Sequence, residues 1–575
     1  MNIRQLLDSR VSQALIAAGA PNNASAVIKQ SNRPEFGHYQ ANGVMGAAKQ
    51  LKMNPRELAS KVLEALELDD IAEKVEIAGP GFLNIHLKME WLSQQLELAL
   101  SNDKLNINQV DKPQTVVIDY SGPNLAKEMH VGHLRSTIIG DALARTLAFV
   151  GHKVIRQNHV GNWGTQFGML LAHMNSLKTS GEELSMQLSD LEGFYRDAKK
   201  RFDNEPEFAE TARDYVVKLQ AGDEECLALW QQFIDISLQH CDDIYSRLNV
   251  LLTRDDVMPE SAYNDDLADV IKDLDKAGLL TEDQGAQCVF LEEFKGKDGK
   301  ILPAIVQKSD GGYLYATTDL AALRYRHNTL HADRILYFVD ARQSLHLNQV
   351  FAIAKAANFV PQETQLEHMA FGTMMGKDGK PFKTRDGGTV KLIDLLTKAE
   401  QRAFDLVSEI NPDLSEDERQ SIAHTVGIGA VKYADLSKNR SSDYIFNWDT
   451  MLSFEGNTAP YLQYAYARIQ SIFRKAGKID SSVPIHLNEP AEQQLGVKLL
   501  QLIEAIELVV KDGTPNILCN YLFELAGNFM SFYEACPILK AENDIKNSRL
   551  KLAKLTAKTL DTGLGLLGID TLDKM

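Results

Sequence analysis

The 575-residue sequence is poor in cysteine: it has five cysteines, and no two of them are spaced as a Cys-x-x-Cys pair. This spacing argues against a cysteine zinc site and a disulfide framework, and it predicts a reducing, cytoplasmic location. No run of about 18 apolar residues is present, so no membrane association is expected. The first 21 residues mix charged with apolar residues and lack the continuous apolar stretch of a signal peptide.

Positive charge is also scarce, with 61 Lys and Arg residues against 78 Asp and Glu residues and a net charge of −17. A dedicated nucleic-acid binder is usually basic overall, so composition alone does not suggest RNA. A large enzyme can still bind RNA through local basic patches. The length predicts three or four domains, and a hydrophobic content of 44% is ordinary for globular proteins.

One strand-to-helix connection organises the rest of the chain. Residues 115–118 are a β-branched run typical of a buried parallel strand. After residue 133, apolar residues recur mostly at spacings of three and four as far as Gly151, which predicts a helix, and Val154 and Ile155 indicate a second strand. Residues 119–133 therefore connect strand to helix in a βαβ unit, where open α/β sheets bind ligands.

The residue types in this connection suit a polyphosphate. A helix N-terminus attracts anions, and His130 and His133 are spaced so that their ring donors can point to one side. Gly132 lets a base or phosphate approach the backbone, and Lys127 adds a cation upstream. Two alternatives remain: the histidines could ligate a metal, although no third ligand is obvious nearby, or they could be capping or surface residues.

The sequence Ser-Gly-Pro-Asn-Leu-Ala-Lys-Glu-Met-His-Val-Gly-His at residues 121–133 resembles a family signature. Its last four residues match the His-x-Gly-His of class I aminoacyl-tRNA synthetases, and the whole stretch is similar to the arginyl-tRNA synthetase version. The resemblance implies that Lys127, His130 and His133 are catalytic and that these three residues and Gly132 bind ATP. Small nucleotidyltransferases share the four-residue motif, so the longer match carries the argument.

The resemblance implies a multidomain α/β protein with a Rossmann-like parallel-sheet catalytic domain, a small α+β N-terminal domain and a C-terminal α-helical anticodon-binding bundle. A predicted hairpin at 75–87 begins Val-Glu-Ile-Ala-Gly-Pro-Gly-Phe-Leu-Asn, similar to the family's N-terminal domain, which contacts the tRNA elbow. The expected domains are 1–110 (N-terminal), 112–400 (catalytic, with a helical insertion at about 170–285), 401–455 (a connecting helical segment) and 456–575 (anticodon-binding).

Within the catalytic domain, the glycine-rich segment 158–168 is either a loop lining the nucleotide site or a turn around a packed tryptophan. Asn162 stands where the family usually has aspartate. The acidic insertion is most simply a solvated face. The catalytic sheet is expected to resume at 288–291 and 304–306 and to include 335–339.

A basic loop at 376–388 carries four basic residues against two acidic ones. Class I enzymes place a Lys-Met-Ser-Lys loop here, whereas this chain has Pro-Phe-Lys-Thr-Arg. The resemblance assigns Lys383 to catalysis and, with Arg385, to ATP binding, and it pairs this departure with Lys127. A solvated turn would look the same.

Selection of arginine requires carboxylates, because a guanidinium group is always charged and has five donors. The residues that match the family's arginine pocket are Asp119, Asn124, Tyr315, Asp319 and Gln343. Asp319 could otherwise be a simple charge near a helix N-terminus.

Residues 546–558 form the clearest basic stretch, predicted as one amphipathic helix. It resembles the anticodon-binding bundle, so Lys551, Lys554 and Lys558 are candidate tRNA-binding residues, together with Tyr461, which could stack on a base or pack.

The resemblance therefore implies an ATP-dependent ligase of protein biosynthesis that forms arginyl-adenylate and transfers arginine to the 3′ end of tRNA-Arg. ATP with Mg²⁺ is expected, without a protein-bound metal, and the expected partners are tRNA-Arg, L-arginine and ATP but not DNA. The protein is expected to be a monomer and to need tRNA for activation. The alternatives are another class I synthetase, which would lack the acidic arginine pocket, and a non-catalytic RNA-binding paralogue, which should have lost His130, His133 or Lys127.

Overall fold

The computed structural model describes residues 2–31, 33–180, 188, 190–382 and 390–575. The chain divides into two compact units. Unit 1 comprises Met1–Gln109, Ser453–Gly565 and Asp570–Met575, and unit 2 comprises Val110–Leu452 and Leu566–Ile569. The expected division into four domains stays a prediction. In the described part of the chain, no helix combines the length and the apolar character needed to cross a membrane.

The first part of unit 1 is an α+β fold, as expected. Its elements are α1 (Ile3–Ala17), β1 (Ile28–Gln30), β2 (Tyr39–Ala41), α2 (Gly43–Leu51), α3 (Pro55–Ala65), β3 (Ala72–Ala78), β4 (Phe82–Leu87) and α4 (Met89–Ser101). The four strands form an antiparallel sheet in the order β1-β2-β4-β3, which confirms the predicted hairpin. Helix α3 begins at Pro55, because the Asn54 side chain accepts a hydrogen bond from the amide of Arg56 and Pro55 fits the first turn.

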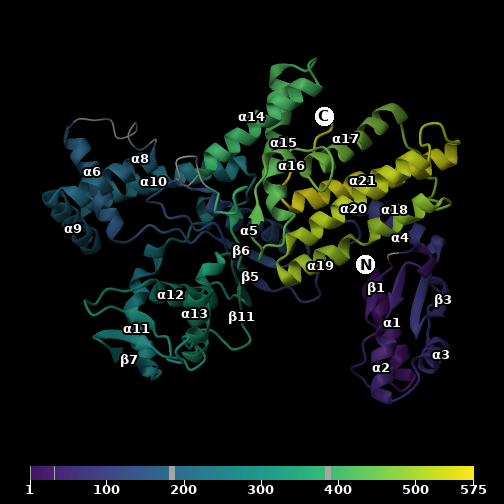
Figure 1. Cartoon of the computed structure of the whole chain (residues 1–575), viewed down its shortest axis with the longest axis horizontal. Coiled ribbons are helices and arrows are strands. Elements are labelled where there is room, and N and C mark those ends of the chain that lie inside the picture. Colours follow the sequence, from purple (N-terminus) through teal and green to yellow (C-terminus); the bar gives the residue numbers. More distant parts are fainter. Residues whose placement is uncertain (1, 32, 181–187, 189, 383–389) are drawn as a thin grey trace. The chain divides into compact units, whose positions relative to one another are not determined.

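The second part of unit 1 is helical (Figure 1). Its helices are α17 (Ala459–Ala476), α18 (Pro490–Leu500), α19 (Leu502–Asp512), α20 (Pro515–Ala535) and α21 (Asn543–Leu566). Helix α20 packs against α17, α18 and α19 through a continuous apolar face that includes Leu518, Leu522 and Phe529. The helical C-terminal region is therefore confirmed.

Unit 2 is built on a four-stranded parallel sheet. Its strands are β5 (Thr115–Asp119), β6 (Lys153–Gln157), β10 (Arg334–Tyr337) and β11 (Gln365–His368), in the order β11-β10-β5-β6. Helix α5 (Val131–Phe149) connects β5 to β6, so the predicted βαβ unit is confirmed. Because β6 and β10 flank β5 on opposite sides, a crevice is expected at the carboxyl end of β5. The register places Asp119 beside both Gln157 and Tyr337 at that end.

One prediction for the sheet is wrong. The segments 288–291 and 304–306 do not extend the parallel sheet. They belong to a separate antiparallel sheet of β7 (Leu280–Asp283), β8 (Ala286–Val289) and β9 (Ala304–Gln307). A short apolar run does not reveal which strand it will pair with, and in β9 the side chain of Ile305 is 42% exposed while its neighbours Ala304 and Val306 are buried.

Helices supply most of the remainder of unit 2. Those between β6 and β7 are α6 (Thr165–Ser180), α8 (Leu191–Asn204), α9 (Pro206–Ala221), α10 (Glu224–Arg247) and α11 (Leu267–Lys276), with short 3-10 turns at Arg254–Asp256 and Glu260–Asp266. Later elements are α12 (Tyr315–Asn328), the 3-10 turn η4 (Ala341–Gln343), α13 (Ser344–Ala356), β12 (Met374–Met375), α14 (Leu392–Ile410), α15 (Glu416–Leu436), β13 (Tyr444–Ile445) and α16 (Trp448–Met451).

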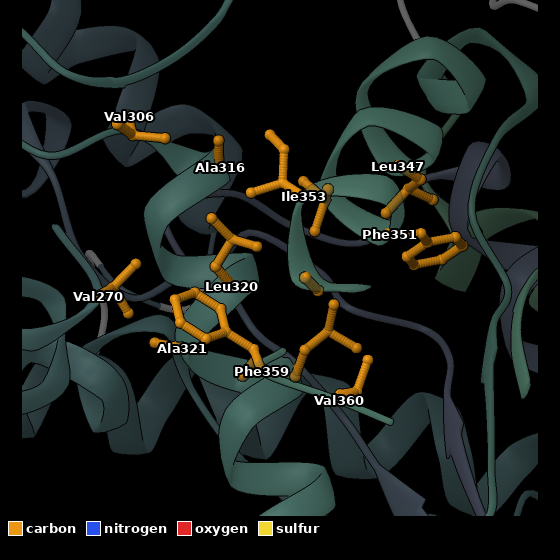
Figure 2. Close-up of a cluster of buried hydrophobic side chains, with 14 of the residues drawn as sticks. Val270, Val306, Ala316, Leu320, Ala321, Leu347, Phe351, Ile353, Phe359 and Val360 are labelled. Carbon is orange, nitrogen blue, oxygen red and sulfur yellow. The ribbon is translucent and has the colours of Figure 1, made fainter. Parts of the chain in front are cut away.

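A buried cluster fixes the two helices that lead into the crevice. Figure 2 shows Ala316 and Leu320 of α12 in one apolar cluster with Phe351 and Ile353 of α13. Val117 of the central strand β5 belongs to the same cluster. Burial of each of the larger side chains, such as Leu320, Phe351 and Ile353, stabilises the fold by about 1.5–3 kcal/mol, so the first turns of α12 and α13 are held firmly against the sheet.

Candidate active site

A cleft of about 620 Å³ opens at the carboxyl ends of β5 and β10. It is lined by Asp119, Tyr120, Ser121, Gly122, Asn124, His130, Gly132, His133, Ser136, His159, Gly161, Glu260, Tyr315, Thr318, Asp319, Tyr337, Phe338, Val339, Asp340, Arg342, Gln343, His346, Leu347 and Phe371. The cleft therefore brings together the two signature histidines, the signature glycine and all five residues predicted to bind arginine. Lys127 is not among its lining residues.

His130 and His133 cap helix α5 and also line the cleft. The Nδ1 of His130 accepts a hydrogen bond from the amide of Gly132, and the Nδ1 of His133 accepts one from the amide of His130, each at 3.0 Å. Because both Nδ1 atoms are acceptors, each neutral ring carries its proton on Nε2. Burial lowers the pKa of His133 to about 3 and also lowers the pKa of His130. The interpretation of these histidines as capping residues is thus confirmed, and the capping hydrogen bonds hold both rings as neutral donors.

Gly132 is required for this arrangement. A Cβ atom added at residue 132 would lie 2.7 Å from Cε1 and 2.8 Å from Nδ1 of the His130 ring. Any side chain there would displace the ring from the start of the helix. The glycine of the signature therefore lets His130 fold back over the backbone.

Asp119 lies at the carboxyl end of β5, as predicted, but its charge is already balanced. Its Oδ2 accepts a hydrogen bond of 2.7 Å from the fully buried guanidinium of Arg326, whose Nε also donates to Gln157 at 2.6 Å. Arg326 also lies over the Tyr337 ring, 4.9 Å from its centroid. The structure thus places Asp119 in an internal ion pair, a partner that no sequence pattern indicated.

Glu260 is a cleft residue that sequence reasoning missed. It lies at the start of a 3-10 turn inside the insertion expected at about 170–285, whose acidic residues were interpreted from sequence as a solvated face. Burial, with repulsion from Asp319, raises the pKa of Glu260 to about 7. Burial and the charge of Glu260 also raise the pKa of Tyr315. No periodicity or motif in the sequence marks Glu260 as part of the site.

Asp319 faces the cleft from the second turn of α12 and has one polar partner on α13. The Nε2 of His346 lies 2.6 Å from Oδ2 of Asp319. This hydrogen bond raises the pKa of His346 above its ordinary value, against the opposing effect of burial. Tyr315 begins α12 and is 68% exposed at the rim of the cleft. His346 is a second site residue that the sequence did not reveal.

The glycine-rich segment after β6 holds one wall of the cleft. The amide of Leu125 donates to the carbonyl of Gly161 at 2.8 Å, and Gly161 and Asn124 both line the cleft. Asn162 is buried and exchanges two hydrogen bonds with Ser261: its amide group donates to the hydroxyl, and its carbonyl oxygen accepts from the backbone amide. Asn162 thus fixes the residue next to Glu260. Trp163 packs edge-on against Trp230, so the segment both packs and lines the cleft.

The remaining predicted residues lie at the margin. Gln343 ends the turn η4 and is exposed where it lines the cleft. Lys127 is exposed, with its ammonium 4.2 Å from the centroid of the Tyr195 ring. Lys383 and Arg385 lie outside the described residues. Across the described ranges, no group of three or more His, Cys, Asp or Glu residues is arranged to hold a metal ion.

The tRNA-binding candidates in unit 1 have different surroundings. Lys551 is buried and pairs with Glu97 of α4 at 2.9 Å. The ammonium of Lys558 donates to the carbonyl of Asn102 at 2.7 Å. Lys554 is exposed, and Tyr461 is half-buried against the Phe523 ring. The helix at 543–566 therefore uses part of its basic side to hold α4.

Two neutral imidazole donors at a helix N-terminus, on one side of a parallel-sheet cleft with acids on the other, suit a nucleotide and a cationic group. This sheet and signature define the catalytic domain of a class I aminoacyl-tRNA synthetase. A family model described as the class I (R) tRNA synthetase catalytic domain matches residues 95–448. Models for an arginyl tRNA synthetase N-terminal domain and a DALR anticodon-binding domain match residues 5–87 and 462–575. The chain belongs to the arginyl-tRNA synthetase family.

Individual relatives agree over the full length. The chain is 64% identical over 578 residues to an arginine–tRNA ligase of Hahella chejuensis, with 100% of each chain covered. Its fold is similar to the crystal structure of arginyl-tRNA synthetase from Plasmodium falciparum, with a TM-score of 0.87, 30% identity, and 100% and 99% of the two chains covered. The arginyl-tRNA synthetase of Thermus thermophilus gives a TM-score of 0.84 at 26% identity, with 100% of both chains covered. The family predicted from the signature is confirmed.

Proposed function

We propose that the cleft of unit 2 joins arginine to tRNA-Arg at the expense of ATP, and that the arginine side chain lies between Glu260 and Asp319. Full-length relatives named arginine–tRNA ligase support the reaction. The observation that carries the amino-acid choice is that Glu260 and Asp319 line the same cleft, where burial and the charge of Asp319 raise the pKa of Glu260 to about 7. Two half-buried acids that repel each other are stabilised by a cation between them.

A guanidinium group fits this site better than an ammonium group does. Its planar fork can donate to two carboxylates at once, and it stays charged at every physiological pH. Tyr315 stands beside Glu260 and offers a ring face on which the guanidinium plane can stack. Asn124 and Gln343 line the cleft and can hold the polar groups of the substrate.

Asp119 has a different role in this proposal from the one the sequence suggested. Because Arg326 neutralises it, Asp119 contributes less to the binding of a second guanidinium than Glu260 and Asp319 do. Its ion pair instead secures the carboxyl ends of β5 and β6 through Arg326 and Gln157. The arginine pocket is therefore formed by the start of α12 and the segment before α11.

Activation begins when an oxygen of the arginine carboxylate attacks the α-phosphorus of ATP. The bond from that phosphorus to the bridging oxygen breaks, and pyrophosphate leaves with its electron pair. The chain positions the reactants and stabilises the growing negative charge. His130 and His133 supply neutral Nε2–H donors, and Lys127 supplies a cation, with Lys383 and Arg385 as further cationic candidates. ATP enters as its Mg²⁺ complex, with the ion held through phosphate oxygens.

In the second step, a hydroxyl of the terminal ribose of tRNA attacks the carbonyl carbon of arginyl-adenylate, and AMP leaves. Unit 1 supplies the candidate tRNA contacts, with exposed Lys554 and half-buried Tyr461 among them. The protein is also proposed to act as a monomer. A cytoplasmic location is proposed because all five cysteines are free thiols, as in proteins of a reducing compartment. Light scattering on the purified protein tests the oligomeric state.

Pyrophosphate exchange with each amino acid in turn, with and without tRNA, tests the function directly. Exchange is expected with arginine when tRNA is present. Exchange with lysine at a comparable rate would contradict the guanidinium pocket. Exchange with an uncharged amino acid would contradict the acidic pair as the basis of selection.

A further inference from the structure

A second lysine, Lys391, ties the signature segment to the helical insertion. The chain at Lys391 runs antiparallel to the chain at His130. The amide of Val131 donates to the carbonyl of Val390 at 3.0 Å, and the amide of Leu392 donates to the carbonyl of Met129 at 2.9 Å. These bonds fix the backbone immediately before helix α5, where the signature histidines lie.

The ammonium of Lys391 links two carboxylates from different parts of unit 2. It lies 2.9 Å from Oδ1 of Asp190 and 3.1 Å from Oε2 of Glu128. Glu128 follows Lys127 directly, whereas Asp190 is the N-cap of α8 and also accepts a hydrogen bond from the amide of Gly193 at 3.1 Å. The first turn of α8 is therefore joined through Lys391 to the signature segment.

The same helix contacts Lys127 in a second way. Tyr195 lies in the second turn of α8, and the Lys127 ammonium lies over its ring, 4.2 Å from the centroid. In the described part of the chain, no carboxylate forms an ion pair with Lys127. The two nearby acids, Glu128 and Asp190, both bind Lys391 instead.

This arrangement separates the roles of the two lysines. Lys391 is neutralised between two carboxylates and holds the backbone in place. Lys127 is held by the negative face of a ring, which attracts the ammonium without cancelling its charge. Its charge also reaches the site, because it contributes, after burial, to the lowered pKa of His130.

From these contacts we propose that Tyr195 is a positioning residue for adenylate formation: its ring holds the Lys127 ammonium, still charged, beside the signature histidines. Helix α8, on the acidic insertion, is then part of the catalytic apparatus rather than only a solvated face. The proposal rests on the proposed role of Lys127 toward the phosphates of ATP. Tyr195 acts through Lys127, so its effect should disappear when Lys127 is removed.

The test is a double-mutant cycle on the full chain, measured as arginine-dependent pyrophosphate exchange in the presence of tRNA-Arg. Tyr195→Leu should lower kcat about tenfold and leave the Michaelis constant for arginine within about twofold, because the lost interaction matters most in the transition state. Tyr195→Phe keeps the ring and should recover most of that loss. In a Lys127→Ala background, Tyr195→Leu should cause no further loss.

A matched control lies on the same insertion. Tyr215 of α9 is also half-buried and also has a lysine over its ring, with Lys218 5.4 Å from the centroid. Tyr215→Leu removes a comparable ring away from the signature segment and should leave kcat unchanged. An equal loss from Tyr215→Leu and Tyr195→Leu would assign both rings to the stability of the insertion and would overturn the proposal.

Fluorination of a phenylalanine at position 195 keeps the shape of the side chain while weakening the negative face of the ring, so it also serves if Tyr195→Leu does not fold. The exchange rate should fall stepwise with the number of fluorine atoms. A rate that ignores fluorination, or equal effects of Tyr195→Leu with and without Lys127, would overturn the positioning role. A Lys127→Ala variant with normal exchange would contradict the role of Lys127 itself. Absence of arginine-dependent exchange by the unaltered protein would instead contradict the proposed function.

Discussion

The Nε2 of His346 lies 2.6 Å from Oδ2 of Asp319, so helix α13 fixes the orientation of a carboxylate that helix α12 presents to the cleft. Both helices are held by the apolar cluster shown in Figure 2. The acid that we assign to the arginine side chain is therefore pre-oriented before any substrate binds, which reduces the entropic cost of recognition.

Replacement of this acid tests the choice of amino acid. Asp319→Asn should lower kcat/KM for arginine by about 10²-fold or more, because a charge-assisted hydrogen bond to a buried cation is lost. The measurement is exchange as a function of arginine concentration, with tRNA present. Asp298→Asn, in an exposed turn of unit 2, is the control and should change nothing. A near-normal kcat/KM for arginine in the Asp319→Asn variant would show that Asp319 is not part of the arginine pocket.

The raised pKa of Glu260 predicts a pH dependence with a definite sign. In the proposed pocket, arginine binds the ionised carboxylate, which predominates above the pKa of about 7. Lowering the pH from 8 to 6 should therefore raise the Michaelis constant for arginine about tenfold, as the ionised fraction falls. Protonation of His346 beside Asp319 acts in the same direction, while Tyr315 stays neutral throughout this range.

Glu260→Gln isolates the contribution of this carboxylate. The variant should have a higher Michaelis constant at every pH and a flatter profile between pH 6 and 8. A pH-independent Michaelis constant in the unaltered protein would argue that Glu260 does not meet the substrate cation.

Removal of Lys127 tests which cation stabilises the leaving pyrophosphate in a chain that lacks the Lys-Met-Ser-Lys sequence of other class I enzymes. Lys127→Ala should reduce the rate of adenylate formation by about 10²–10³-fold, the usual cost of removing one preorganised charge donor. Turnover should fall more than substrate affinity, because the interaction strengthens as pyrophosphate leaves. Normal turnover in this variant, with Lys383→Ala inactive, would assign the role to the loop.

Replacement of the lysines of helix α21 should have different effects, according to whether each lysine is exposed or buried. Lys554→Gln should weaken tRNA binding and reduce its salt dependence, because an exposed lysine releases counterions when it meets phosphate. Lys551→Gln should instead lower the free energy of unfolding by about 1–3 kcal/mol, since Glu97 loses its cationic partner. Binding titrations at several salt concentrations and denaturant unfolding check the two effects. Equal changes in salt slope for both variants would contradict this division.

Exchange of pyrophosphate should require tRNA. The family resemblance implies this requirement, and the candidate tRNA-binding residues Lys554 and Tyr461 belong to unit 1, whereas the cleft belongs to unit 2. Exchange is expected to be undetectable without tRNA and restored by tRNA-Arg. Robust exchange by the protein alone would contradict the prediction.

Local structure was largely predictable from the sequence. The strand at 115–119, the following helix and the caps at Asn54 and His130 depend on neighbouring residues, whose spacing and chemistry decide the backbone. The signature identified the family because its function requires particular residues in consecutive positions. The requirement for glycine at position 132 is local too, because only a residue without a side chain leaves room for the His130 ring two residues before it.

Pairing between distant segments was decided only by the tertiary structure. The sequence could not assign 288–291 and 304–306 to a separate sheet, because the residues of a short apolar strand do not show which other strand it will pair with. The partnership of Asp119 with Arg326 spans 207 residues and changes the role of an acid that the motif placed correctly. Glu260 enters the site from a 3-10 turn, where no periodic pattern exists to mark it.

The sequence by itself therefore determined the family, the order of the main helices and strands, and most of the residue types that line the cleft. The tertiary structure decided which of the charged side chains are already paired within the protein and which can still interact with a ligand. Asp119 and Lys551 are neutralised by distant partners, whereas Glu260 and Asp319, both half-buried, line the same cleft, and burial together with the charge of Asp319 raises the pKa of Glu260. Electrostatic interaction depends on distance and burial, and both are set by the packing of segments that lie far apart in the chain.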